Sequence, residues 1–149
     1  MFRKILSTQN DFTLTLARVV LGVVFFAHGA QKMLGIFGGR GFSGTVGLYG
    51  EMGFSTSLAV LAMATEFFGG LALIVGFLSR IAAVGVIGKM AVAIFTLHSR
   101  NGFFMNWSGE QRGEGIEYHL LAIALAVVIL VKGSGALSLD GLLSRSAPK

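Results

Sequence analysis

Four long apolar stretches divide the chain, and none shows the strict alternation typical of a half-buried β-strand. They run over Leu14–Leu34, Ser57–Leu78, Arg80–Leu97 and Ile116–Val131. Each approaches the ~20 residues that a helix needs to cross a hydrocarbon core about 30 Å thick. Lipid offers no hydrogen-bond partner to an open backbone, so segments of this kind are expected to be helices. The pattern predicts an all-α, integral-membrane four-helix bundle formed by one domain over residues 1–149.

Composition and charge narrow the class of protein further. Hydrophobic residues make up 54% of the chain and charged residues only 13%, whereas soluble domains carry about 25% charged residues. The chain has no cysteine, which excludes disulfide scaffolds, thiol redox chemistry and cysteine-ligated metal clusters. The net charge of +5 does not indicate a nucleic-acid partner, because the only basic cluster is Arg3–Lys4. The composition therefore excludes a small water-soluble enzyme and leaves a membrane protein.

Basic residues in a membrane protein gather on the cytoplasmic side. Outside the span centres, six Lys and Arg residues fall on the side of the chain termini and four on the opposite side. This count predicts that both termini are cytoplasmic. The two longer connections, over residues 35–56 and 98–115, would then face outward.

Short helices are expected outside the four spans. In the first outer loop, glycine recurs at every third position from Gly41 to Gly53, with apolar and aromatic residues between. We interpret this segment as a short helix or re-entrant piece at the membrane interface, with a flexible lid as the alternative. Near the C-terminus, Gly133 is expected to cap the fourth span and Ser138 to begin a short helix. Asp11 is expected to cap the first span.

Four ionisable residues lie inside the apolar stretches, where charge is costly and usually functional. They are Arg18, His28, Glu66 and Lys89. Arg18, Glu66 and Lys89 share a helix face with glycine or alanine, the residues that let membrane helices approach closely. Glu66 and Lys89 lie at similar depth, so we expect an ion pair, with Arg18 reaching the same carboxylate. Such an interior would attract a quinone carbonyl or an inorganic oxyanion; alternatively, the pair only fixes helix register.

A second polar cluster is expected toward the outer face. It contains His28, Lys32, His98, Glu117, Tyr118 and His119. We expect a polar ligand site or, alternatively, interfacial side chains bonded to backbone or headgroups. No His-x-x-x-His or Glu-x-x-His pair supplies two ligands from one helix, so the spacing favours neither a metal nor haem. Phe103, Phe104 and Trp107, together with Tyr118, suit an aromatic belt or the walls of a quinone site.

Taken in order, these motifs resemble the DoxX family of small bacterial inner-membrane proteins, which is related to DoxD. The resemblance covers Leu14 to Leu143 and rests on Arg18–Gly22, His28–Lys32, Glu66–Gly70 with Gly76, Asn101–Phe104, Gly115–Tyr118, and Gly133–Gly135 with Ser138–Asp140. It implies a four-helix protein of the bacterial inner membrane, with relatives linked to thiosulfate:quinone oxidoreductase and to oxidative-stress assemblies. By resemblance, the polar signature consists of Arg18, His28, Lys32, Glu66, Glu117 and Tyr118.

The leading functional hypothesis is a membrane subunit of a quinone-linked oxidoreductase. In this hypothesis Arg18, Glu66 and Lys89 form the interior ligand site, with Lys32, Tyr118 and His119 as further binding residues and His28 or Glu117 as a proton relay. A soluble oxidoreductase subunit is the expected protein partner. One alternative is a non-enzymatic membrane scaffold that docks such a subunit, and another is a small transporter subunit. The small-residue stripes fit packing within one chain and a homo-oligomer equally well.

Overall fold

The computed structural model describes residues 2–146, and the regular secondary structure within this range is entirely helical. Three helical runs are long and apolar enough to cross a membrane. The first is α2 (Phe12–Leu34); the second joins α4 (Thr56–Ala64), the π-helical turn η1 (Thr65–Gly69) and α5 (Gly70–Val75). The third joins α6 (Ser79–Ala93), the π-helical turn η2 (Ile94–His98) and the 3₁₀ turn η3 (Ser99–Asn101). The predicted all-α class is thus confirmed, and three of the four predicted spans are helices long and apolar enough to cross a membrane.

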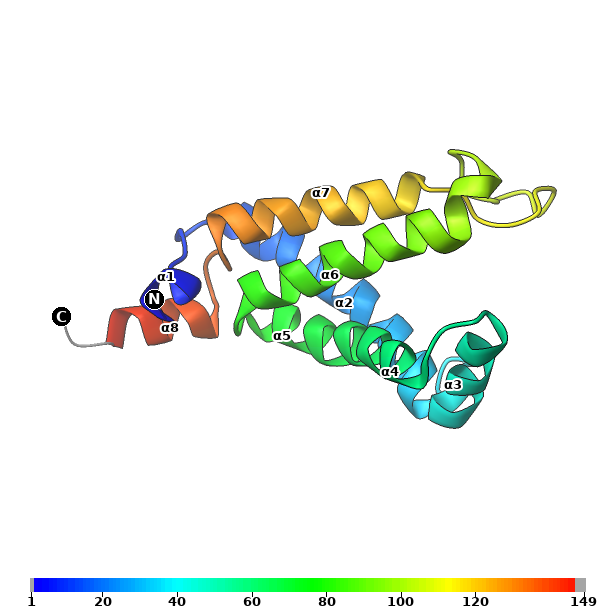
Figure 1. Ribbon diagram of the computed structural model, residues 1–149. Coiled ribbons are helices and arrows are strands. Elements are labelled where there is room, and N and C mark those ends of the chain that lie inside the picture. The colour runs from blue at the N-terminus through cyan, green and yellow to red at the C-terminus, as the bar shows by residue number, and fades with distance from the viewer. Residues whose placement is uncertain (1, 147–149) are drawn as a thin grey trace.

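The fourth predicted span corresponds to α7 (Glu117–Lys132), which has 16 residues. At 1.5 Å per residue it is about 24 Å long, shorter than a ~30 Å hydrocarbon core. Figure 1 shows α7 lying along α6, and it also contacts α2. The predicted fourth span is therefore a helix that packs against α6 and α2.

Close backbone contacts at glycine residues bring α2 against the second helical run, formed by α4, η1 and α5. A Cβ atom built at Gly29 would lie 2.3 Å from the backbone nitrogen of Phe67, and one at Gly70 would lie 2.4 Å from that of Phe26. Backbones this close leave no room for a side chain. The core adjoins this contact and is formed by Leu21, Phe25, Leu73, Ala82, Ala83, Val86, Met90, Ala122, Ala126 and Ile129.

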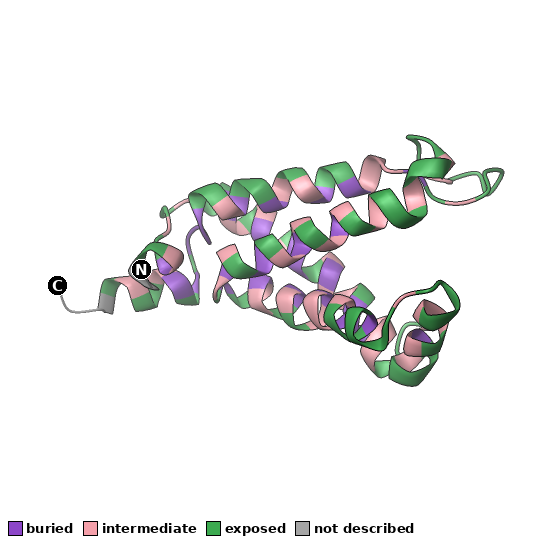
Figure 2. Cartoon of the chain, in the orientation of Figure 1, coloured by how far each residue is buried: buried purple, intermediate pink, exposed green. Residues whose placement is uncertain are grey.

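The short helices lie at the two ends of the long ones. Helices α1 (Phe2–Leu6) and α8 (Leu139–Ser146) meet beside the chain termini, whereas α3 (Gly41–Glu51) lies at the opposite end (Figure 1). The predicted helices in the first loop and near the C-terminus are therefore present. Buried residues concentrate between these ends and beside α8 (Figure 2).

The predicted caps are confirmed by their hydrogen bonds. The carboxylate of Asp11 accepts from the backbone N–H groups of Thr13 and Leu14 at the start of α2. The hydroxyl of Ser138 accepts from the N–H of Gly141 at 3.1 Å, at the start of α8. Gly133 ends α7 with φ of 91°, a left-handed region that favours glycine.

Candidate functional site

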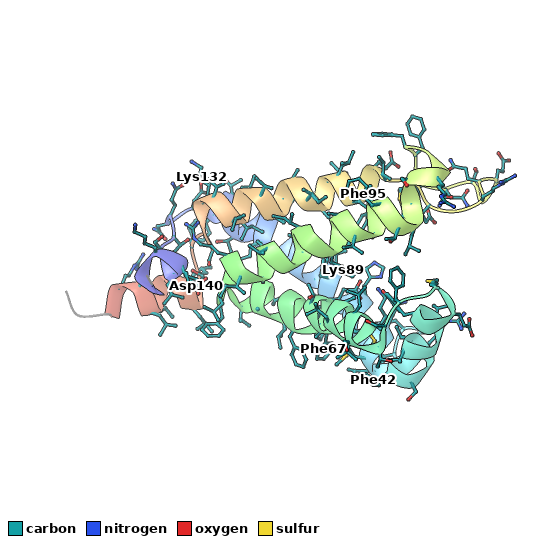
Figure 3. All side chains as sticks on the ribbon, in the orientation of Figure 1. Phe42, Phe67, Lys89, Phe95, Lys132 and Asp140 are labelled. Atoms are coloured by element: carbon teal, nitrogen blue, oxygen red, sulfur yellow. The ribbon has the colours of Figure 1, made fainter. Side chains whose placement is uncertain are left out.

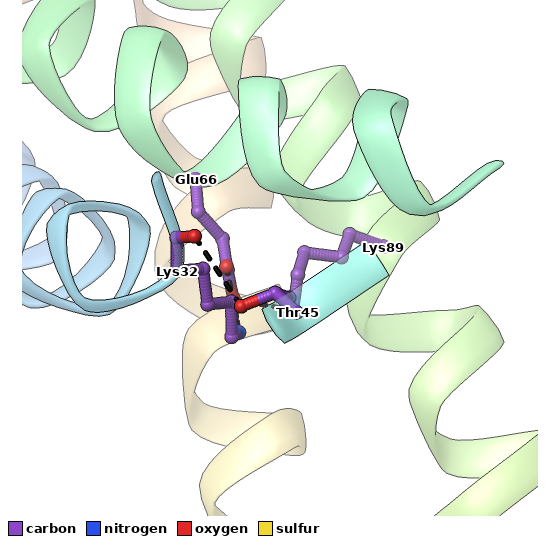
Figure 4. Close-up of polar contacts among 4 residues, drawn as sticks. All are labelled: Lys32, Thr45, Glu66 and Lys89. Atoms are coloured by element: carbon purple, nitrogen blue, oxygen red, sulfur yellow. Dashed lines mark hydrogen bonds and ion pairs between the residues drawn. The ribbon is translucent and has the colours of Figure 1, made fainter. Parts of the chain in front are cut away.

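Two lysines from different helices converge on one buried carboxylate. Glu66 is only 3% exposed. The Nζ atom of Lys32 lies 2.6 Å from both carboxylate oxygens, and the Nζ atom of Lys89 lies 2.7 Å from Oε1 (Figure 4). We call these three residues the lysine–glutamate triad. The expected pair of Glu66 and Lys89 is present, but the second cation is Lys32 rather than Arg18.

Local backbone structure explains why the triad forms. Glu66 lies on η1, a π-helical turn, and such turns are frequent at functional sites. The close contact of Gly29 with this turn brings α2 against it. Lys32 is three residues beyond Gly29 on the same face of α2, so its long side chain can reach Glu66. Lys89 completes the triad from α6.

An apolar pocket adjoins the triad between α4 and α6. Its volume is about 270 Å³, and Lys89 is the only charged residue that lines it. Figure 3 shows Lys89 between the two helices. Gly88 leaves space on this wall, because no atom lies within 4 Å of a Cβ built there. The other lining residues are Tyr49, Phe54, Leu58, Leu61, Ala62, Thr65, Val84, Gly85, Val92, Ala93, Thr96 and Leu97.

A polar pocket of about 290 Å³ lies on the other side of the triad. Its charged lining residues are Lys32 and Arg40. The remaining lining residues are Gln31, Gly38, Gly39, Thr45, Leu48, Tyr49, Met52 and Leu97. Tyr49 and Leu97 line both pockets. The triad thus contributes one lysine to each of two neighbouring pockets.

Helix α3 supplies two residues that sequence reasoning missed. Thr45 is buried, and its hydroxyl donates to the backbone carbonyl of Lys32 at 3.3 Å. Burial and then the nearby charge of Glu66 raise the pKa of Tyr49, so its phenol stays protonated at neutral pH. A signal for both was present in the sequence. Thr45, Leu48, Tyr49 and Met52 follow the i, i+3, i+4, i+7 spacing of one helix face, and all four line the polar pocket.

The predicted outer cluster is divided in the structure. His28 lies within electrostatic range of all three triad residues. His98 and His119 form a separate stack, with ring centroids 4.2 Å apart, and the ring of Tyr118 meets His119 edge-on at 5.5 Å. This stack lies close enough to the triad for the charge of Glu66 to act on Tyr118 and for the charge of Lys89 to act on His119.

Glu117 does not join either group. Its Oε1 accepts from the backbone N–H of Met105 at 2.8 Å and from the indole N–H of Trp107 at 3.4 Å. The carboxylate therefore fastens the loop before α7 to the first turn of that helix. The expectation that six polar groups meet at one outer site is wrong, because local loop contacts occupy Glu117.

Arg18 also lies apart from the triad. Its guanidinium donates to the backbone carbonyls of Leu73, Ile74, Ser134 and Leu137. The expectation that Arg18 approaches Glu66 is therefore wrong. Arg18 faces the end of α5 and the segment after α7, whose carbonyl groups fully engage its side chain.

Comparisons with known proteins agree with this architecture. The DoxX family model matches residues 13–99. Inner membrane protein YqjF of Escherichia coli (strain K12) is 29% identical over 91% of this chain and 95% of its own length. The protein named Putative oxidoreductase CatD of Bacillus subtilis (strain 168) is 28% identical over 84% of this chain and 82% of its own length. No solved structure matches. The chain belongs to the DoxX family.

Proposed function

We propose that this DoxX-family protein is an inner-membrane subunit of a quinone-linked oxidoreductase, and that a quinone headgroup binds in the apolar pocket. One observation carries the proposal: Lys89 pairs with the buried Glu66 and also lines that pocket. A cation is thereby held beside an otherwise uncharged cavity. This is the arrangement that an apolar ring with polar carbonyl groups requires.

The proposed membrane arrangement is a four-helix bundle in which α7 is the fourth crossing. Three observations support it: three other helical runs are long enough to span a membrane, α7 packs along α6, and α7 carries exposed apolar residues such as Leu121 and Val131. A helix of 16 residues can cross if the bilayer thins locally or flanking residues reach the interface. The name of the Escherichia coli relative supports an inner-membrane location. The distribution of Lys and Arg favours cytoplasmic termini.

The residues of the pocket fit a quinone by their chemistry. When bound, a quinone supplies an acceptor for two electrons and two protons. The ammonium group of Lys89 donates to a carbonyl oxygen and offsets negative charge developing there. Glu66 offsets the charge of that ammonium within the membrane, where an unpaired charge would be costly. The walls formed by Leu61, Val84 and Val92 are apolar, as a quinone ring requires.

Proton supply is assigned to His28 rather than to Glu117. His28 lies within electrostatic range of the triad, and imidazole is the side chain best suited to relaying protons near neutral pH. Glu117 is held by the loop before α7. The name of the Bacillus subtilis relative supports an oxidoreductase role.

The test is to measure quinone by mass spectrometry in lipid extracts of the protein purified from native membranes. Gly88→Leu should fill the apolar pocket without a clash, because no atom lies within 4 Å of a Cβ at Gly88. Gly47→Leu is the matched control, since it is an equally open helical glycine that lines neither pocket. Quinone should accompany the wild type and Gly47→Leu but be lost from Gly88→Leu. Folded wild-type protein without quinone would contradict the proposal and favour a scaffold that docks a soluble oxidoreductase.

A further inference from the structure

The polar pocket carries positive charge and no carboxylate on its walls. Lys32 and Arg40 line it, and no Asp or Glu is among its lining residues. Glu66 pairs with Lys32 at 2.6 Å but is almost fully buried and is not among the described residues that line the pocket. A pocket of about 290 Å³ beside two cations is large enough for a small anion.

Arg40 is available to bind a ligand. It is exposed and makes no hydrogen bond or ion pair with any residue from 2 to 146. A guanidinium group presents paired N–H donors that match the oxygens of a carboxylate or an oxyanion. In contrast, the guanidinium groups of Arg18 and Arg80 donate to backbone carbonyl groups, although the Nε atom of Arg80 has no described partner. Arg40 therefore lies at the polar pocket, and the N–H donors of its guanidinium group are free to bind a ligand.

Tyr49 adds a neutral donor to the same pocket. Its hydroxyl makes no hydrogen bond to any described residue, and it lines the polar pocket opposite the wall of α2. Burial, followed by the charge of Glu66, raises the pKa of Tyr49. The phenol therefore keeps its proton at neutral pH and can donate it in a hydrogen bond to an anion.

We propose that the polar pocket is a binding site for a small anion, an oxyanion or a carboxylate, held by Arg40, Lys32 and Tyr49. The proposed binding of an anion depends only on the observations made for the polar pocket. Its role rests on the proposed function: because both pockets share Tyr49 and Leu97, the anion would be the water-soluble ligand brought next to the quinone. The oxyanion could belong to a free solute or to the phosphate of a lipid headgroup.

The absence of native cysteine allows a direct test of both pockets. Met52→Cys places a thiol in the polar pocket, and Leu58→Cys places one in the apolar pocket. Labelling by neutral N-ethylmaleimide is followed in lipid-free detergent, with sulfate or a short-tailed ubiquinone as the added probe. At a probe concentration about ten times its dissociation constant, labelling of a covered thiol should fall about tenfold.

We expect sulfate to protect Met52→Cys and not Leu58→Cys, and the quinone to protect Leu58→Cys. Adding Arg40→Gln should abolish protection by sulfate, and the fold should survive because Arg40 is exposed and has no described partner. Protection that appears only in phosphatidylglycerol nanodiscs and is lost in Arg40→Gln would assign the anion to a lipid headgroup.

Two results would overturn the inference: no protection of Met52→Cys by either source, or protection that persists in Arg40→Gln. If sulfate does not protect Met52→Cys while the quinone still protects Leu58→Cys, the proposal of an anion site is wrong and the proposed function stands. If the quinone fails while sulfate protects Met52→Cys, the proposed function is wrong and the anion site stands.

Discussion

Two groups of buried charge lie at different positions along the long helices, and they are built differently. At the end near the chain termini, Arg18 and Asp140 are each 1% exposed. Arg18 donates to four backbone carbonyls. Asp140 accepts from the N–H groups of Leu78 and Ser79 and from the hydroxyl of Ser134. We call this group the Arg18–Asp140 network.

Farther from the chain termini, around Glu66 and Lys89 in the middle of their helical runs, the lysine–glutamate triad is buried but not enclosed by backbone. The hydrogen bonds and ion pairs described for Glu66 come from Lys32 and Lys89, and each lysine lines a pocket. In the Arg18–Asp140 network, by contrast, the charged side chains donate and accept hydrogen bonds within the protein. These bonds join α2, the α5–α6 turn and the C-terminal segment. Burial of charge alone therefore does not mark a functional site. A functional site also requires that the charged group can contact a ligand.

The largest effect is expected at Asp140. Asp140→Ala leaves two N–H groups and one hydroxyl without their acceptor. Each buried unsatisfied donor costs about 1–3 kcal/mol, so the three together should lower the unfolding free energy by roughly 3–9 kcal/mol. The midpoint of thermal unfolding in mild detergent measures the loss.

Glu51→Ala is the control for Asp140→Ala, because Glu51 is an exposed carboxylate near the opposite end. It should unfold like the wild type. If Asp140→Ala left the midpoint unchanged, the Arg18–Asp140 network would not be the structural element described above.

Gly29→Val should separate the helices that assemble the triad. Its Cβ would meet the backbone of Phe67, which cannot move aside like a flexible side chain. Overpacking of this kind costs roughly 1–3 kcal/mol, and it should also draw Lys32 away from Glu66. Gly47→Val, with open space around its Cβ, is the control. Thermal unfolding and quinone content should both fall for Gly29→Val; unchanged values would show that the close contact is not required.

The smallest effect concerns Tyr49 and pH. Its raised pKa means that the folded state holds the phenol proton beyond pH ~10, where an unfolded tyrosine ionises. Its contribution to stability is therefore complete below that pH and is lost as pH rises through the raised pKa. The unfolding midpoint of the wild type should fall relative to that of Tyr49→Phe above pH ~10. Because Lys32, Lys89 and Glu66 are common to both proteins, the difference isolates Tyr49; parallel curves would contradict it.

Much of the fold could be predicted from hydrophobic pattern and local chemistry. The long helices, the cap at Asp11 and the helix at Gly41–Glu51 depend on neighbouring residues, so the sequence carries their signal directly. The pair of Glu66 and Lys89 was also predictable, because both residues are central in adjacent apolar stretches. Similar depth was enough to identify them as partners.

The partners of Arg18 and Lys32 were not predictable in this way. The carbonyl of Ser134 that binds Arg18 is 116 residues away along the chain, and no local pattern indicates that contact. Lys32 lies near the C-terminal end of α2, so its position suggested the histidines as its neighbours. Its pairing depends on the length of its side chain and on the π-helical turn that places Glu66. The sequence pattern did not predict that turn.

The central claim is tested most directly by comparing Lys89→Met with Lys32→Met. Each variant removes one ammonium group and leaves Glu66 paired with the other lysine, so the two should lose similar stability. Only Lys89 lines the apolar pocket. A hydrogen bond to a charged group is worth about 1.5–3 kcal/mol, so Lys89→Met should lose quinone by at least about tenfold. Lys32→Met should retain quinone in the same mass-spectrometric assay. Equal quinone content in the two folded variants would contradict the account and leave the triad a device that fixes helix register.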